Sequence, residues 1–221
     1  MRNKFCAVAV AGAFVAFAGF NVQAADLRVK GTIAPASCSF TITNSVIDYG
    51  RIDPNTLSAT NYTKLGAKST PYAIKCGSNV KTKVSLKAID NRASSKIPNL
   101  MISQFGPNYV DRYQYGLGNT AKAQKIGGYV VHLRNSVADG KAVSVMGSNN
   151  NGGVWVPTST EAVGNAATDL TSWHTGNFTP VSLNTLSGNL EVHAVINKTS
   201  ELDLNSQVNL DGQATLELRY L

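Results

Sequence analysis

Short segments in which apolar and polar residues alternate run along most of the chain, with turn residues between them. A period of two is typical of β-strands that bury one face, whereas a helical period of 3.6 is weak everywhere in this sequence. Only 55–65 and 159–169 could hold a short turn of helix. The sequence therefore predicts an all-β, antiparallel β-sandwich, with strands that include 27–33, 40–42, 47–49, 72–76, 84–88, 129–134, 141–145, 154–156 and 214–221.

Three dipeptides mark probable hairpin turns between these segments. Asp139-Gly140, Asn151-Gly152 and Asp211-Gly212 each separate two strand-like runs. Asp-Gly and Asn-Gly tolerate the positive φ angles of tight turns, so each predicts an antiparallel reversal of the chain.

The first residues have the parts of a secretory signal peptide. Arg2 and Lys4 precede an uncharged apolar run that reaches Ala24. Cleavage after Ala24 leaves small residues at the two recognition positions, whereas cleavage after Ala25 would place Gln23 at one of them. The alternative is a membrane anchor, but the run is shorter than a spanning helix needs, and no second stretch is as apolar. We expect 1–24 to be a signal peptide, 25–221 to be one domain, and no transmembrane anchor to remain.

The cysteines predict one disulfide. Cys6 lies in the signal peptide, which leaves Cys38 and Cys76 as the pair in the exported chain. Cys76 shares its face with Tyr72 and Ile74, so we expect the bond to be buried between the sheets. A redox-active pair would more commonly have the C-x-x-C spacing, which is absent here.

The chain is basic, with 20 Lys and Arg against 13 Asp and Glu. These charges are spread thinly along the sequence, which favours a solvated surface over a nucleic-acid site.

No pattern of catalytic or cofactor-binding residues is evident. His132, His174 and His193 lack a metal-ligand spacing, and His132 and His193 alternate with apolar residues, which predicts polar strand faces. A metal site assembled from distant strands stays open as an alternative. There is no G-x-S-x-G elbow, and Gly116-Leu117-Gly118 is too short for a nucleotide loop. The sequence thus predicts a protein that is not an enzyme, with no catalytic residues, no metal and no cofactor.

Both ends of the exported chain resemble subunits of chaperone–usher pili. Residues 30–38 are similar to the first pilin strand, which runs through a Gly into the first cysteine, and 214–221 is similar to the C-terminal strand with its penultimate aromatic residue. The resemblance implies an immunoglobulin-like, pilin-type sandwich with loop insertions. It also implies that a chaperone adds a strand along the C-terminal segment. The residues implied as strand-addition contacts are Ala214, Leu216, Leu218, Tyr220 and Leu221.

Five short islands give a narrower resemblance, to an uncharacterised, fimbrial-type periplasmic family that we call GltF-like. They run in order through the chain: 46–50, 89–92, 116–118, 125–127 and 210–212. The resemblance implies a periplasmic or fimbrial location in a Gram-negative cell and no established activity.

One departure from the pilin pattern concerns assembly. Only Ala25 and Asp26 precede the strand expected from Leu27, and two residues span roughly 7 Å, too little to fill a neighbouring subunit. We therefore expect the protein to accept a strand but not to donate 25–33. The extra residues 94–128 or 147–180 could instead supply the missing strand internally.

Together these features predict an exported structural protein of fimbrial assembly or cell adhesion. Its expected partners are a periplasmic pilus chaperone and fimbrial subunits, and it is expected to bind no nucleic acid. The alternative is a self-complete, monomeric periplasmic binding or regulatory protein of the GltF type.

Overall fold

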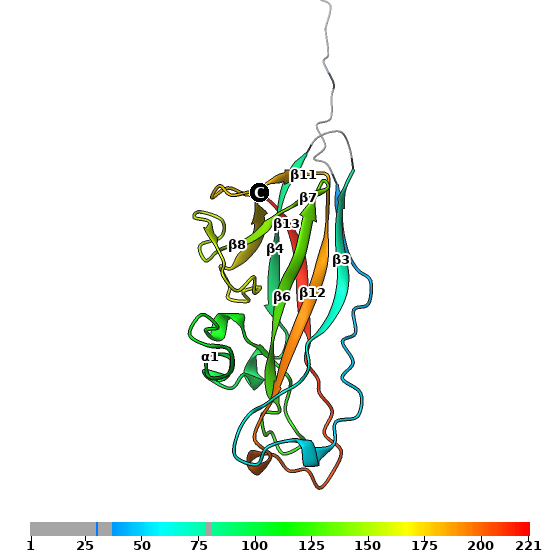
Figure 1. The fold of residues 1–221 in the computed structure, drawn as a ribbon, viewed down its shortest axis with the longest axis vertical. Helices are drawn as coiled ribbons and strands as arrows, with labels where there is room; N and C mark the ends of the chain where they lie inside the picture. Colours follow the sequence, from blue (N-terminus) through cyan, green and yellow to red (C-terminus); the bar gives the residue numbers. More distant parts are fainter. Residues whose placement is uncertain (1–29, 31–36, 78–80) are drawn as a thin grey trace, which may run out of the picture. The chain divides into compact units, whose positions relative to one another are not determined.

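Antiparallel strands make up most of the regular structure in residues 30, 37–77 and 81–221, which are the residues that the computed structural model describes (Figure 1). The strands of this part of the chain are β1 (Cys38–Ile42), β2 (Thr63–Lys64), β3 (Lys68–Cys76), β4 (Thr82–Asp90), β5 (Tyr115–Gly116), β6 (Gly127–Ala138), β7 (Lys141–Ala142), β8 (Ser144–Ser148), β9 (Val156–Pro157), β10 (Leu170–His174), β11 (Ser182–Leu183), β12 (Thr185–Ile196) and β13 (Ala214–Tyr220). The helical segments are α1 (Leu100–Phe105) and the 3-10 turns η1 (Pro54–Thr56), η2 (Ala93–Ser95), η3 (Asp111–Tyr113) and η4 (Thr199–Glu201).

Two sheets form a sandwich within residues 35–221, as the alternating sequence predicted. The first has the order β1-β3-β12-β6-β5, with β2 beside β12 and β7 beside β6. The second has the order β11-β4-β10-β8-β9, and β13 also pairs with β4. Leu86 of β4 has Leu218 as its partner in β13 and Thr171 as its partner in β10, so β13 takes the edge of β4 that faces away from β10.

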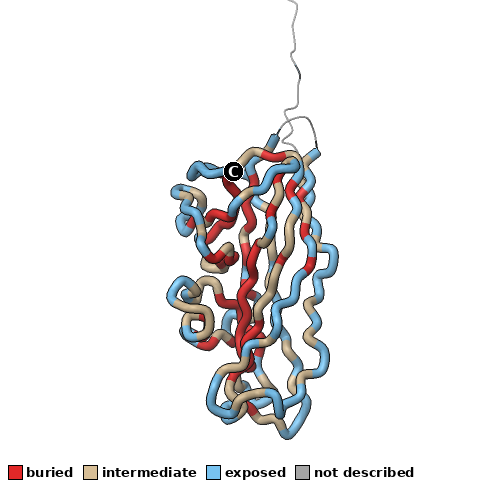
Figure 2. Tube along the Cα trace, viewed as in Figure 1, coloured by how far each residue is buried: buried red, intermediate tan, exposed pale blue. Residues whose placement is uncertain are grey.

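A shared hydroxyl joins the two sheets at the centre of the core. Tyr72 of β3 and Trp173 of β10 are both buried, and their rings stack with centroids 6.3 Å apart. The Ser136 hydroxyl of β6 lies 2.8 Å from the Tyr72 hydroxyl and accepts a hydrogen bond of 3.1 Å from the indole N–H of Trp173. These bonds satisfy polar atoms that burial would otherwise leave without partners. Figure 2 shows the buried residues concentrated along the middle of the sheets.

A second, smaller cluster covers the opposite face of β6 and β12. Val130 of β6 and Val195 of β12 pack there against Leu100 and Met101 of α1. Both faces of β6 are covered in this region, so its first seven residues are all buried. Buried and exposed residues therefore do not alternate along this part of the strand. Figure 1 shows α1 beside β6.

Two of the three predicted hairpins are confirmed. Asp139-Gly140 connects β6 to β7, and Asn151-Gly152 lies between the paired strands β8 and β9, with positive φ at all four residues. The third prediction is wrong, because 207–210 is not a strand. Asp211 instead accepts hydrogen bonds from the Arg92 side chain, so it anchors an irregular segment.

Other local expectations are also corrected. Residues 159–169 contain no helix, whereas α1 lies in a segment for which no helix was expected. Residues 47–49 are irregular, held by the Tyr49 hydroxyl, which donates to the Val192 carbonyl oxygen. The long central strand β12 was predicted only around His193. Its register shifts between Ser187 and Asn189, where Gly188 lies against the Tyr72 ring, so the alternation is interrupted.

The predicted disulfide between Cys38 and Cys76 is confirmed. The two residues are register partners in the adjacent strands β1 and β3, so the bond links strands of one sheet. Both cysteines are half-buried, and the expectation of a bond buried between the sheets is wrong. The predicted signal peptide, the expected strand at 27–33 and the proposed limits on strand donation by 25–33 lie outside the described residues. Among the residues that the structure describes, no helix has the length and hydropathy that crossing a membrane requires.

Candidate functional site

The last strand, β13, is paired on one side only. All seven of its residues pair with β4, from Ala214 opposite Asp90 to Tyr220 opposite Val84. No other described strand pairs with it. The segments that could have supplied an internal strand lie elsewhere, since β5 in 94–128 pairs with β6, and β9 and β10 in 147–180 pair with β8. The possibility that these segments complete the fold beside β13 is therefore wrong.

The pairing pattern fixes which backbone groups of β13 are free. Asn91 N–H donates to the Gln213 carbonyl, and Leu221 N–H donates to the Lys83 carbonyl. In an antiparallel ladder, hydrogen-bonded pairs recur at every second residue, so the odd-numbered residues of β13 bond to β4. The N–H and C=O groups of Ala214, Leu216, Leu218 and Tyr220 consequently point away from β4, toward the open side.

The first strand, β1, has a matching open side. It pairs with β3, and no other described strand pairs with it. Gly77 N–H donates to Ser37 and Thr43 N–H donates to Pro71, so here too the even-numbered residues turn their backbone groups outward. Phe40 packs partly buried against the main core. We call these two outer sides, of 38–42 and of 214–220, the β1–β13 edge.

The side chains of β13 show how this edge is built. Leu216 and Leu218 are half-buried against the main core, as is Ala214. Glu217 and Arg219 form an ion pair with each other on the other face. Tyr220 is 49% exposed, and its hydroxyl oxygen accepts a hydrogen bond from the Cys38 N–H, 2.7 Å away. Leu221 is also exposed. The β1–β13 edge thus combines apolar side chains with unpaired backbone groups, and the role of these residues as strand-addition contacts stays a prediction.

Three of the five islands that suggested the GltF-like resemblance, 89–92, 116–118 and 210–212, meet near the start of β13. The Arg92 guanidinium donates to both carboxylate oxygens of Asp211, at 2.8 and 3.0 Å. Asp211 N–H donates to the Leu117 carbonyl, and Asp90 accepts from Gly116 N–H at 3.1 Å. A side chain at Gly116 would collide with the Arg92 carbonyl oxygen, which explains the glycine. This corner fixes the chain at Asp211, three residues before β13 begins, and so helps to position the last strand.

Two histidines that the sequence placed on polar strand faces are brought together by the structure. His132 of β6 is buried, because Ala162 pairs with it along the edge of β6 and the Tyr109 ring packs on its imidazole. His193 of β12 lies beside it, with ring centroids 5.0 Å apart. Burial, together with Arg134 and His193, lowers the pKa of His132 to about 4, so its imidazole is neutral at neutral pH. Their sequence spacing gave no sign of this proximity, which depends on the register of β6 against β12.

Part of the chain matches a family model of unknown function, and the chain is similar to two bacterial proteins. Residues 27–130 match DUF1120, described as "Protein of unknown function". The chain is 25% identical to Protein GltF of Escherichia coli (strain K12) over an alignment that covers 98% of this chain and 95% of GltF. It is 27% identical to Uncharacterized protein YhcF of the same organism, with 93% of this chain and 95% of YhcF covered.

This chain is homologous to both proteins, and the predicted GltF-like resemblance is confirmed to that extent. Neither name states an activity.

Proposed function

We propose that this protein is an exported, non-enzymatic structural and assembly protein of the bacterial envelope, and that the β1–β13 edge accepts a β-strand from a partner. The observation that carries the proposal is the one-sided pairing of β13, whose even-numbered backbone groups point outward beside half-buried leucines. An added strand would pair with these groups and cover the apolar side chains.

An uncovered strand edge with apolar side chains promotes aggregation, which favours the binding of a partner that covers it. An open strand with apolar side chains is a template for aggregation unless a partner or a charged residue blocks it. Arg219 and Glu217 project from the other face and do not cover Leu216 or Leu218. A periplasmic pilus chaperone or a fimbrial subunit is the proposed partner, which places the protein in the periplasm or in a fimbrium.

The disulfide and the N-terminal sequence support export. Cys38 and Cys76 are bonded, and such bonds persist in oxidising compartments outside the cytosol. The basic, apolar start of the chain has the sequence of a secretory signal. A pilin-type assembly role agrees with both features.

The test is co-expression with a periplasmic pilus chaperone of the host, followed by size-exclusion chromatography. We expect a one-to-one complex with the wild-type chain. Leu216→Asp should abolish the complex, because it places a charge in the apolar row of the edge. Thr215→Asp is the matched control, since Thr215 is the exposed neighbour in the same strand, and it should keep the complex. Near-UV circular dichroism of both variants verifies that they fold.

Amide hydrogen exchange separates this proposal from the alternative of a self-complete, monomeric binding or regulatory protein. In the isolated protein the amides of Leu216 and Leu218 should exchange fast, and those of Glu217 and Arg219 should exchange slowly. Chaperone binding should slow the first two. A stable monomer that binds no chaperone, with Leu216 and Leu218 already protected, would contradict strand acceptance and favour the alternative.

A further inference from the structure

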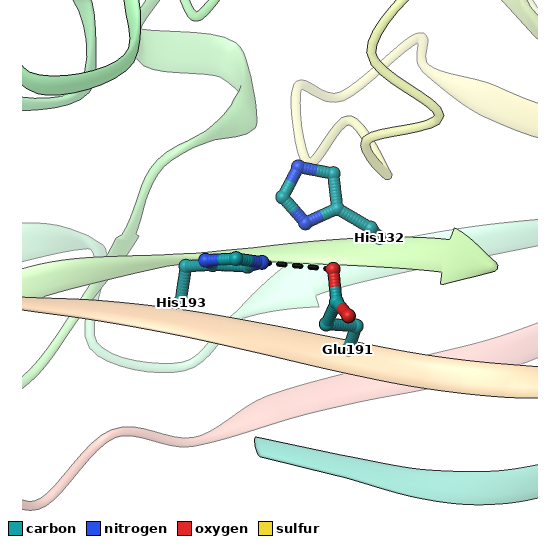
Figure 3. A group of neighbouring side chains, drawn as sticks. All are labelled: His132, Glu191 and His193. Atoms are coloured by element: carbon teal, nitrogen blue, oxygen red, sulfur yellow. Dashed lines mark hydrogen bonds and ion pairs between the residues drawn. The ribbon is translucent and has the colours of Figure 1, made fainter. Parts of the chain in front are cut away.

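Three side chains with metal-binding atoms converge on the outer face of β6 and β12. His132 of β6 is the register partner of Glu191 of β12. His193 follows Glu191 by two residues, so it projects from the same face. One ligand atom from each of the three side chains lies within 4.8 Å of the other two, and Figure 3 shows the two histidine rings and the carboxylate turned toward a common centre.

The Nδ1 atom of His132 is the strongest sign of a ligand. His132 is 1% exposed, and among the described residues its Nδ1 has no hydrogen-bond partner. In Figure 3 one ring nitrogen of His132 faces Glu191 and His193. A buried polar atom without a partner is uncommon in folded proteins and calls for an explanation, such as an ion that the atom binds.

The other ring nitrogen of His132 has a partner that suits a metal ligand. Nε2 lies 3.3 Å from the Tyr109 hydroxyl, and the two rings pack edge to face. With the proton on Nε2, the neutral imidazole presents its Nδ1 lone pair to the common centre. Histidines that bind metals usually donate their second N–H to a neighbouring oxygen in this way, which fixes the tautomer and the ring orientation.

The charged side chains around the cluster favour the binding of a cation. Glu191 accepts from the Nε of Arg134 at 3.3 Å and from the Nε2 of His193 at 2.8 Å. Arg134 also forms a shorter ion pair with Glu161, 2.6 Å from its Nη1. The two carboxylates of Glu191 and Glu161 outnumber the one guanidinium of Arg134, a balance that suits a bound cation.

A simple ion-pair network is the competing interpretation. Arg134 and His193 account for the carboxylate of Glu191 without a metal. They leave the buried Nδ1 of His132 without a hydrogen-bond partner among the described residues. That atom distinguishes the two interpretations.

We propose that His132, Glu191 and His193 bind one Zn²⁺ ion, with His132 bound through Nδ1. Two imidazole nitrogens and one carboxylate oxygen are a zinc-binding set that leaves a fourth position for water. Imidazole ligands also suit Cu²⁺ and Ni²⁺, whereas Mg²⁺ and Ca²⁺ prefer oxygen ligands alone. His193 and Glu191 are only partly buried, so an ion can reach the site from solvent.

Small side-chain rotations would give the coordination distances. Ligand atoms bound about 2.0–2.1 Å from a tetrahedral Zn²⁺ ion lie roughly 3.3 Å from each other. Nε2 of His193 would give up the proton that it now donates to Glu191, and this proton would move to Nδ1 or to solvent. Nε2 and Glu191 Oε1, now 2.8 Å apart, would then separate by about half an ångström, and His132 would move toward them. The ion would then link β6 to β12 on the face that α1 covers.

Isothermal titration of the untagged, chelator-treated exported protein with ZnCl₂ tests the proposal. We expect one Zn²⁺ per chain. His193→Gln and Glu191→Gln should each weaken binding at least about tenfold, and Tyr109→Phe, which removes only the outer hydrogen bond, by about tenfold. Titration with Co²⁺ should give visible absorption bands of a four-coordinate site, and these should be lost in His193→Gln.

Two control variants keep the three ligands. His174→Gln changes a histidine of β10 in the other sheet and should leave the affinity unchanged. Arg134→Gln removes a competing cation and should preserve or strengthen binding. The proposal is overturned if the wild-type protein takes up less than one Zn²⁺, or if His193→Gln and Glu191→Gln both bind as tightly as wild type. Because both of these side chains are partly exposed, the result does not depend on whether a variant of the buried His132 folds.

Discussion

The backbone N–H of Cys38, at the start of β1, donates a 2.7 Å hydrogen bond to the hydroxyl oxygen of Tyr220, at the end of β13. This bond joins the open edges of the two sheets, and it depends on a side chain that is half exposed. Tyr220 therefore links β13, at the edge of one sheet, to the disulfide-bonded strand β1 at the edge of the other.

We predict that Tyr220→Phe lowers the free energy of unfolding by about 1 kcal/mol, the usual net value of one hydrogen bond. The ring remains, so only the bond to Cys38 is lost. Urea denaturation measures the change. Tyr113→Phe is the control, since no hydrogen bond of the Tyr113 hydroxyl is present among the described residues, and it should change the stability by less than about 0.5 kcal/mol.

Removal of the disulfide should destabilise the protein strongly. Cys38 and Cys76 are separated by 38 residues. A crosslink over a loop of that length stabilises by about 4 kcal/mol through the entropy of the unfolded chain. We expect the Cys38→Ser/Cys76→Ser double variant to lose about this amount in urea denaturation. Thiol titration of the denatured, unreduced exported protein should find no free thiol, and two free thiols would contradict the bond.

Ser136→Ala should cost more than an ordinary surface substitution. It leaves the Trp173 indole N–H and the Tyr72 hydroxyl without their shared partner in the core. Two buried polar groups left unpaired should cost about 2–4 kcal/mol. Ser187→Ala, an exposed serine of the long strand β12, is the matched control and should stay within about 0.5 kcal/mol of wild type. Equal effects of the two substitutions would show that the shared hydroxyl is unimportant.

Asp139 should make the β6–β7 turn sensitive to acid. The Lys81 ammonium, 2.8 Å away, and the N–H groups of Thr185 and Asn184 lower the pKa of Asp139 from 3.8 to about 2. Because this pKa is lower in the folded state, its contribution to stability is complete above about pH 4 and is lost as the pH falls to about 2.

Asp139→Asn should therefore reduce the dependence of unfolding free energy on pH between about 4 and 2, as measured by urea denaturation at each pH. Lys81→Met should reduce the same dependence in part, since it removes the largest cause of the low pKa. An unchanged acid profile in Asp139→Asn would contradict this assignment.

Local sequence determined the strand class, the two real hairpins and the disulfide. Residues 214–220 alternate strictly, and a period of two has one geometrical solution, a strand with one apolar face. Asp139-Gly140 adopts positive φ at both residues, a conformation that these residue types reach at little cost. With Cys6 in the predicted signal peptide, Cys38 and Cys76 were the one pair left to form a bond. Each of these features depends on neighbouring residues or on counting, so it can be predicted from the sequence.

Only the tertiary structure decided which strand edge stays open and which polar residues meet. Among the described strands β13 pairs with β4 and no other, which results from the course of the chain between distant segments. From the sequence, 94–128 or 147–180 could equally have supplied its second partner. His132 and Glu191 face each other because β6 and β12 pair in one register, and His132 is buried because distant residues cover that face. A shift of one residue would turn these side chains to the other face. Register and cover depend on contacts between segments far apart in the sequence, and the alternation within a single strand does not specify them.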